Sequence, residues 1–457
     1  MKDLSKGAVI FVSLALCLHL LFFASLHFGF LNPLYIEANE GHGQASDFFG
    51  IYQAGANLSG GFSIYDSDDY RNEAPRVVPF FYYYRYLPPT AYGFALISLI
   101  LPPWSAYWFW VIVNEILLGL IIWSVVGWRI WPLRRRLIMA GLWLGFFPFY
   151  LEQNMGQFSL TMAAMLWFLW RFDIEGAQGK DLGPEPAFSW SALWADLRQY
   201  RWKQDRFGSP AVLASWTASL VLKSYTIFLV LPYLRDRMLK RAILGGILSA
   251  AVCAPYFIRR PNDLVEFARL NFNPTTHRIL KGALGLQTFI MDGLTRLPGS
   301  WNNLLFTVGP LRVTPAKAIL VLVSLAVVAW AARATLRLHN KPQRRAYDLA
   351  IWSAVFFLIF KTVWEYHYLM ILPGLTAVYF VTGSRTVLTL GILMGLPTLY
   401  AACPLLTGVA SAAPISEWPG WFRMLHFSVK SLPLLLFFIW CTRTEKRAGN
   451  RAELLNG

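Results

Sequence analysis

Four ionisable side chains stand out because each borders or interrupts a strongly apolar stretch. Asp47 begins a segment whose pattern predicts a short amphipathic helix. Lys223 lies near the middle of the apolar stretch 211–234, and Glu365 and His367 directly precede another one. A carboxylate can take a proton from a hydroxyl group, and an ammonium ion can bind a phosphate. These residue types therefore suit acid–base and phosphate chemistry.

The elements that position these side chains are those of a membrane protein. Of the 457 residues, 56% are hydrophobic and only 14% are charged, whereas soluble domains carry about 25% charged residues. We expect one all-α, multi-pass membrane domain over 1–442, followed by a basic cytoplasmic tail over 443–457. The net charge of +16 does not indicate nucleic-acid binding, because the basic residues cluster between apolar runs, as the positive-inside bias predicts.

The apolar runs predict about twelve spans, some of them short or broken, with both termini in the cytoplasm. A first outer loop is expected over 32–104, a cytoplasmic loop over 173–209 and a second outer loop over 259–313. The expected spans are 8–30, 105–127, 137–151, 157–172, two short helices within 211–234, and then 241–258, 315–335, 347–364, 366–382, 386–402 and 423–442.

The distribution of charge decides two ambiguous stretches. If 90–101 crossed the membrane, the arginines from Arg129 to Arg136 would lie outside, against the positive-inside bias. We therefore expect 90–101 to be a helix half-buried at the outer interface. A single crossing by 211–234 would likewise leave Arg235 and its basic neighbours outside, so a break near Lys223 is predicted.

This topology places the polar residues of interest on the outer side. An ammonium ion as deep in an apolar stretch as Lys223 is expected to have a partner, and an anionic phosphate is an obvious one. Glu365 and His367 lie at a tight turn. Two ionisable groups at such a turn favour a position in the wall of an active site. Gln157 would either hydrogen-bond a sugar hydroxyl or satisfy neighbouring helix ends.

Other polar groups of the outer side allow two interpretations each. Asp47 is either the N-cap of its helix or a carboxylate held just above the bilayer as a general base. The second outer loop carries extra positive charge, including Arg259 and Arg260, which suits either lipid headgroups or a phosphate-bearing substrate. The cluster Asp66, Asp68 and Asp69 is more typical of turns than of a metal site.

A set of short motifs occurs in order along residues 45 to 375. They are Asp47-Phe48, Tyr52-Gln53-Ala54-Gly55, Gly61 with Tyr65-Asp66, Tyr86-Leu87-Pro88-Pro89, Gly156-Gln157, Lys223, and Trp364 with His367-Tyr368 and Leu372-Pro373. Taken together, these motifs resemble glycosyltransferase family 87. The sequence departs from the family pattern at Ser159, where an Asn is frequent, at Tyr366-His367, where many members have His-His, and at Leu286-Gln287-Thr288, where an Asn-Gln-Ser element is usual.

The resemblance implies a GT-C-like fold and a mannosyltransferase of the cell membrane that works on the outer face. Its donor would be polyprenyl-phosphate-mannose and its acceptor a lipid or a glycan. Asp47 would act as general base in a one-step inverting displacement. No metal or other cofactor is implied, because the phosphate is already a good leaving group. The residues expected to bind substrate are Lys223, His367, Glu365, Gln157, Tyr52, Gln287, Arg259 and Arg260.

Two other classes of membrane protein remain as alternatives. A transporter or flippase of lipid-linked glycans would be expected to show broken helices in matching positions of two halves, whereas the sequence has one clear break. An outer-face ligase or polymerase of glycans would also be multi-pass with a large outer loop. The position of Asp47 directly after the first span favours the GT-C-like interpretation over that one.

The predicted topology can be tested with single cysteines placed in a cysteine-free background and an impermeant thiol reagent. A cysteine within 40–80 should react in intact cells, because the first loop is expected outside. A cysteine within 180–205 should react only after permeabilisation. The opposite pattern would contradict the proposed orientation.

Overall fold

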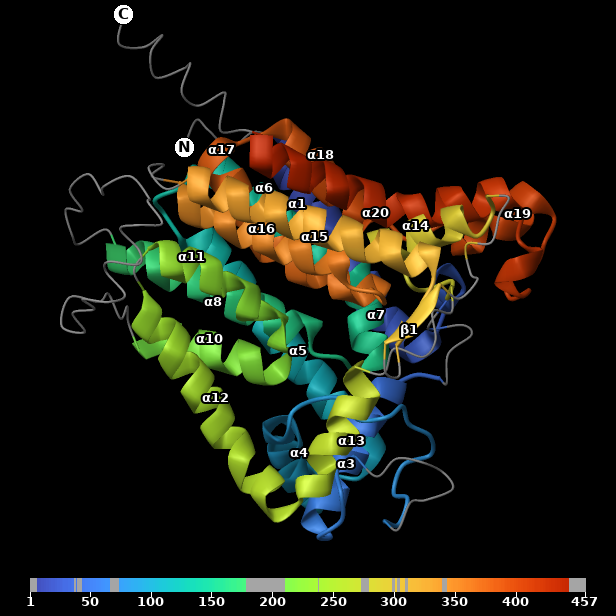
Figure 1. The fold of residues 1–457 in the computed structure, drawn as a ribbon. Helices are drawn as coiled ribbons and strands as arrows, with labels where there is room; N and C mark the ends of the chain where they lie inside the picture. The colour runs from blue at the N-terminus through green and yellow to red at the C-terminus, as the bar shows by residue number, and fades with distance from the viewer. Residues whose placement is uncertain are drawn as a thin grey trace, which may run out of the picture.

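The chain forms an almost entirely helical body in the computed structural model (Figure 1). Within the described residues, five helices are long and apolar enough to cross a membrane, or six if α18 (Arg385–Gly395) and the helical stretch 400–407, bent by 63° from it, make one span. The five are α1 (Lys6–Phe28), α5 (Pro103–Gly127), α12 (Leu239–Arg259), α15 (Pro315–Arg337) and α20 (Gly420–Arg443). The described residues are 6–36, 38, 43–65, 74–177, 210–236, 238–272, 279–297, 301, 305–308, 311–338 and 343–443.

Shorter elements fill the space between these long helices. One antiparallel hairpin, β1 (Phe306–Val308) with β2 (Leu311–Val313), pairs Phe306 with Val313. The shorter α-helices are α3 (Ser46–Ser59), α4 (Pro88–Ile100), α6 (Leu133–Leu144), α7 (Pro148–Met155), α8 (Ser159–Ala177), α10 (Pro210–Leu222), α11 (Val230–Arg235), α13 (Pro261–Phe272), α14 (Leu286–Leu294), α16 (Arg344–Ile359), α17 (Leu372–Thr382) and α19 (Cys403–Thr407). The 3-10 turns are η1 (Asn32–Leu34), η3 (Ser224–Leu229), η4 (Glu365–Ile371), η5 (Tyr400–Ala402) and η6 (Ile415–Glu417).

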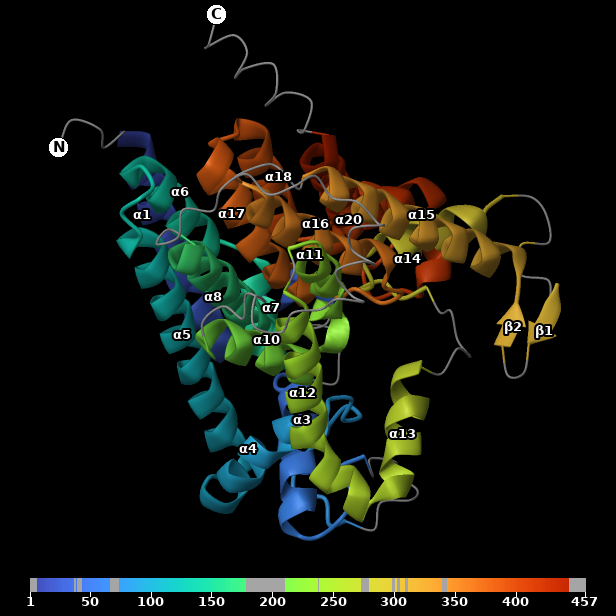
Figure 2. The same ribbon diagram turned by 60° about the vertical axis from the view of Figure 1, so that its left-hand side comes forward.

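Different helices lie at the two ends of the molecule. Helix α1 begins and α20 ends at the same end, whereas α3, α4 and α13 gather at the opposite one (Figures 1 and 2). Helices α5 and α12 extend from the main bundle toward that second end (Figure 2). The arrangement agrees with termini on one side and the Asp47 segment on the other.

The all-helical, membrane-type architecture expected from the sequence is therefore confirmed, while the number of crossings stays a prediction. The stretch expected as one span over 137–151 is not one continuous helix, because α6 ends at Leu144 and α7 begins at Pro148. Pro148 has no N–H and fits the first turn of a helix, so a new helix starts there. Similarly, 366–382 begins as the 3-10 turn η4 before α17. Of the expected cytoplasmic loop, 173–177 continue α8, and 178–209 lie outside the described residues.

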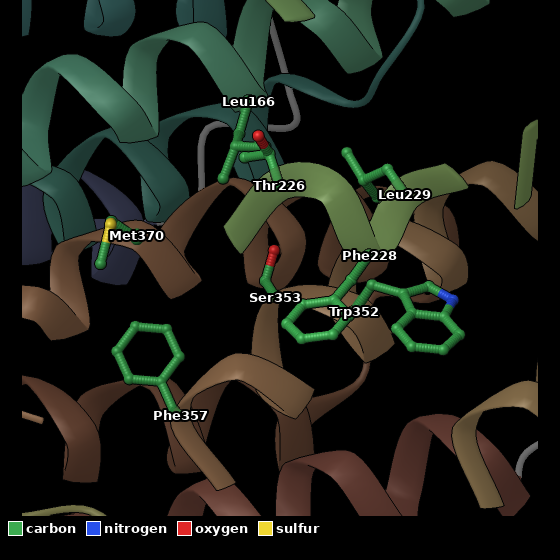
Figure 3. A pocket seen from close by; sticks show the side chains of 8 residues that line it. All are labelled: Leu166, Thr226, Phe228, Leu229, Trp352, Ser353, Phe357 and Met370. Atoms are coloured by element: carbon green, nitrogen blue, oxygen red, sulfur yellow. The ribbon is translucent and has the colours of Figure 1, made fainter. Parts of the chain in front are cut away.

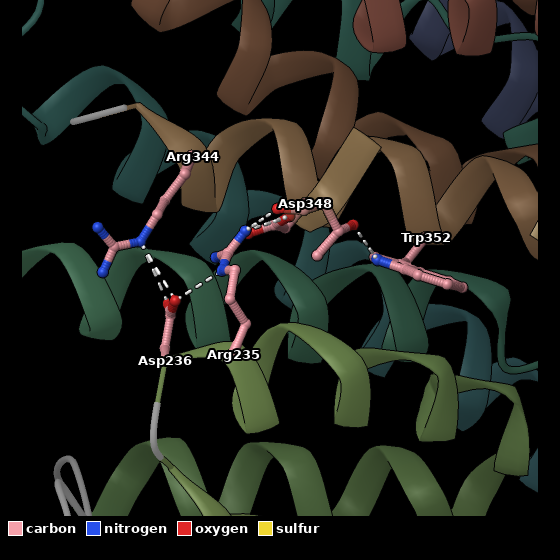
Figure 4. A network of polar contacts seen from close by, with 6 residues as sticks. Arg235, Asp236, Arg344, Asp348 and Trp352 are labelled. Atoms are coloured by element: carbon pink, nitrogen blue, oxygen red, sulfur yellow. Dashed lines mark hydrogen bonds and ion pairs between the residues drawn. The ribbon is translucent and has the colours of Figure 1, made fainter. Parts of the chain in front are cut away.

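The expected break near Lys223 is confirmed. Helix α10 ends at Leu222, and Lys223 has an extended backbone (φ −151°, ψ 108°) before η3 and α11 follow. The end of this broken segment is anchored by Arg235, whose guanidinium binds Asp348 of α16 in a bidentate contact of 2.6 and 3.2 Å (Figure 4). Arg235 also donates to the carbonyl of Thr335 at 2.7 Å, so α11 is tied to both α15 and α16.

Helices α3 and α4 pack at very short distance. A Cβ added to Gly55 would lie 2.4 Å from the backbone carbon of Phe94, so only glycine permits this approach. The opposite side of α4 leaves Leu96, Leu99 and Ile100 exposed, at 65%, 71% and 76%. An apolar exposed side is what the expected interfacial position of this helix requires.

The close approach predicts that Gly55→Ala destabilises the protein. The added methyl group has to displace the α4 backbone, which should cost about 1–3 kcal/mol and lower the thermal unfolding midpoint in detergent. The matched control is Gly93→Ala in α4, where an added Cβ meets nothing within 4 Å and should be neutral or stabilising. Equal midpoints for the two variants would contradict the packing described.

Candidate active site

Asp47 lies in the first turn of α3, but it is not the N-cap. The cap position is Ala45, in the left-handed region (φ 67°), and no side chain caps this helix end. The backbone N–H of Ala45 donates instead to the carbonyl of Asn154 in α7 at 2.8 Å. A carboxylate in the first turn is favoured by the helix dipole. The capping interpretation of Asp47 is therefore ruled out, and its side chain remains available to other groups.

The turn between α7 and α8 brings Gln157 to Asp47. Gly156 has a φ of +71°, and a Cβ there would lie 2.4 Å from the Cβ of Phe48, so glycine is required for both reasons. Gln157 is buried, accepts a hydrogen bond from the Tyr86 hydroxyl and hydrogen-bonds the Asp47 carboxylate. The side chain of Gln157 thus contacts the candidate base, and its two expected roles, binding a sugar hydroxyl or satisfying helix ends, stay predictions.

The surroundings of Asp47 favour its protonated form. Desolvation by burial raises the pKa of the carboxyl above its ordinary value of 3.8, although the side chain remains partly exposed. Four groups act in the opposite direction: the hydrogen bond from Gln157, the charge of Lys223, the hydroxyl of Tyr366 and the charge of Arg85. The Tyr366 hydroxyl lies 3.4 Å from Asp47 Oδ2. A carboxylate with a raised pKa and an accessible oxygen is suited to accept a proton.

Lys223 projects from the break between α10 and η3. Its Nζ atom is buried and has no hydrogen-bond partner among the described residues. The ammonium lies 6.0 Å from the centre of the Tyr86 ring and acts electrostatically on Asp47, Glu152 and His367. A buried cation in this state is suited to an anionic group of a ligand.

His367 forms a further wall of the site from η4. Its Nδ1 accepts a hydrogen bond from the backbone N–H of Trp364 at 3.3 Å, and its ring packs edge-on against Tyr366 with the centroids 4.7 Å apart. The site thus combines side chains from four separate segments: α3, the α7–α8 turn, the break after α10, and η4.

The remaining residues expected from the sequence lie elsewhere. Glu365 turns away from Asp47 and pairs with Lys430 of α20 at 3.1 Å. Tyr52 donates to the carbonyl of Leu101 at 2.8 Å and thereby braces α3 against the C-terminal end of α4. These two side chains have structural partners rather than a place beside Asp47.

Gln287 and the two loop arginines are also outside the Asp47 cluster. Gln287 donates to Ser324 Oγ at 3.0 Å and to backbone carbonyls of α15 and α16. Arg259 is exposed, and Arg260 donates to the carbonyl of Gly61. The second outer loop is partly helical, since α13 and α14 lie within it.

The sequence interpretation missed Glu152. This residue lies in α7, is fully buried, and acts electrostatically on Lys223. It was overlooked because 137–151 was taken as one span, which placed Glu152 in the turn after it. A signal was present: Pro148 restarts the helix, so the polar run Glu152-Gln153-Asn154 falls within a buried helix.

An apolar pocket lies beyond the break, between α8, η3, α16 and η4 (Figure 3). Apart from the hydroxyls of Thr226 and Ser353, its lining is hydrophobic, and no ionisable side chain belongs to it. This pocket therefore supplies no charged group to the Asp47 cluster. In the described part of the chain, no group of three or more His, Cys, Asp or Glu side chains is placed to hold a metal ion; Asp66, Asp68 and Asp69 lie outside that part.

Comparison with known proteins adds no assignment: no protein-family model matches the chain, and no curated protein sequence matches it. The function has to be argued from the geometry of the Asp47 cluster.

The raised pKa of Asp47 predicts how this residue affects stability. A carboxyl group whose pKa is higher in the folded than in the unfolded protein destabilises the fold once it ionises. Asp47→Asn cannot ionise, so its unfolding midpoint at pH 7 should lie above that of the wild type. The difference should shrink as the pH falls toward 3.8. A less stable variant at pH 7 would mean that the ionised carboxylate holds the fold together.

Proposed function

We propose that the protein is a membrane glycosyltransferase that moves a sugar from a polyprenyl-phosphate carrier to a hydroxyl group of a lipid or glycan acceptor. Mannose is the first sugar to test, following the resemblance of the motifs to glycosyltransferase family 87. The observation that carries the proposal is the convergence of Asp47, Gln157, Lys223 and His367 from four segments. These are four of the nine positions at which a base and substrate-binding groups were expected.

The proposed reaction is a single displacement with inversion. Asp47 takes the proton of the acceptor hydroxyl, whose oxygen bonds to the anomeric carbon of the sugar. The bond between that carbon and the phosphate oxygen breaks, and the electron pair leaves with the polyprenyl phosphate. Lys223 balances the charge that develops on the leaving phosphate. The buried, unpartnered Nζ atom supports this role, because a phosphate oxygen would give it a charge-assisted hydrogen bond.

The proposed location is the outer face of the cell membrane. Asp47 lies on α3, at the opposite end of the molecule from the start of α1 and the end of α20 (Figures 1 and 2). The basic residues near the termini favour the cytoplasm for that other end. The exposed apolar side of α4 would rest in the membrane interface beside the site.

The direct test is transfer from synthetic polyprenyl-phospho-sugars to fractionated lipid acceptors, with mass spectrometry of the product. Asp47→Asn preserves size and hydrogen bonding but is not a base, so turnover should fall by ~100-fold or more without loss of folded protein. The matched control is Glu266→Gln in α13, a half-buried carboxylate paired with Arg269 and outside the Asp47 cluster, which should transfer normally.

Two results would contradict the proposal in different ways. Near-normal turnover by Asp47→Asn would exclude Asp47 as the base. Movement of intact carrier across the bilayer without a new glycosidic bond would instead identify a flippase.

A further inference from the structure

Two buried atoms of opposite charge near Asp47 lack partners. Glu152 is 0% exposed and the neighbouring Ser159 acts on its carboxylate, but its Oε2 atom has no hydrogen-bond partner among the described residues. The same holds for Lys223 Nζ. The other carboxylate oxygen, Glu152 Oε1, is already engaged, because it accepts the backbone N–H of Leu160 at 2.9 Å and so holds the start of α8.

The two charges act on each other but are not in contact. Glu152 and Lys223 are electrostatically linked, yet they form no ion pair within 4.0 Å in the described part of the chain. Tyr86 is linked to both: its ring is 6.0 Å from Lys223 Nζ, and its hydroxyl, which donates to Gln157, is acted on electrostatically by Glu152. Through Gln157, this region adjoins Asp47.

Buried polar atoms without partners cost about 1–3 kcal/mol each, so their persistence needs a reason. Sites that recognise a substrate hydroxyl contain such atoms, which the correct substrate satisfies. A carboxylate oxygen accepts a hydroxyl proton in a charge-assisted hydrogen bond. It would repel a phosphate. Within one ligand, therefore, Lys223 suits the anionic part, and Glu152 suits a neighbouring part that carries hydroxyl groups.

We propose that Glu152 is a specificity-determining residue: its Oε2 atom accepts a hydrogen bond from a hydroxyl of the donor sugar while Lys223 holds the phosphate of the same donor. This inference rests on the proposed function and extends it. Under this proposal, Glu152 of α7 recognises the sugar. Lys223, at the break after α10, recognises the phosphate separately. Glu152 thus distinguishes a loaded carrier from an empty one.

The test compares two ligands on the full-length protein in nanodiscs: polyprenyl phosphate alone and polyprenyl-phospho-mannose. In Glu152→Gln, the side-chain oxygen can still accept the Leu160 N–H, but an NH2 group replaces the acceptor Oε2. Affinity for the loaded carrier should fall ~10-fold or more, whereas affinity for the empty carrier should not fall. Lys223→Met should lower the affinity for both ligands, because both contain the phosphate.

A second arm begins with the wild type, so its first result does not depend on the folding of a variant. Carriers loaded with each monodeoxy-mannose are titrated in turn, and one of them should bind ~10-fold more weakly than the parent. In Glu152→Gln, that same deoxy carrier should bind no more weakly than the parent carrier does.

Several outcomes would overturn the inference. The first is an equal loss of affinity for the loaded and the empty carrier in Glu152→Gln, and the second is no loss of affinity for either. The third is equal affinity of the wild type for every monodeoxy carrier and the parent carrier. Each would show that Glu152 only holds α8 or balances Lys223, while transfer by the wild type would leave the proposed function standing. A wild type that binds neither carrier would overturn both.

Discussion

The close contact between the α7–α8 turn and α3 is the constraint on which the site depends. Gly156 lies where a side chain would collide with Phe48, and its positive φ reverses the chain within one residue. The hydrogen bond from Ala45 to Asn154 fixes the same contact from the other side. Because of this contact, Asp47 and Gln157 face each other although 110 positions separate them in the sequence. Tyr86 and Tyr366 then close around the pair.

Helix α7 shows how the protein tolerates polar groups in its interior. Gln153 is bonded through its side chain to Glu115 at 3.1 Å and to Asn114 at 3.3 Å, and its carbonyl accepts the Tyr107 hydroxyl at 2.9 Å. One side of the helix is thereby satisfied by α5. Glu152, on the same short helix, has an oxygen, Oε2, without a hydrogen-bond partner in the part of the chain that the structure describes. The contrast fits a helix that is fixed by one set of polar groups so that another can serve a ligand.

Much of the fold is predictable from the sequence because apolar runs and charge clusters are strong signals. The helix at Asp47 and the break at Lys223 appear as expected, since an ammonium ion within an apolar stretch marks a local exception. The direction in which a side chain points at a helix end cannot be predicted from the sequence. Glu365 and His367 are two positions apart in η4, yet one pairs with Lys430 and the other faces the charge of Lys223. That difference arises from the 3-10 geometry of the turn, which local composition does not indicate.

The segment broken at Lys223 is attached unequally on its two sides. Past the break, the bidentate Arg235–Asp348 contact fixes α11 in both distance and angle (Figure 4). Before it, α10 contains no ionisable residue and rests against α8 and α12, mainly through apolar contacts, which have no preferred direction. The segment is therefore held more firmly at its α11 end than at its α10 end. Because directional contacts hold only the α11 side of the break, a rearrangement of the backbone at Lys223 is expected to displace α10 along α8 and α12 more than it displaces α11.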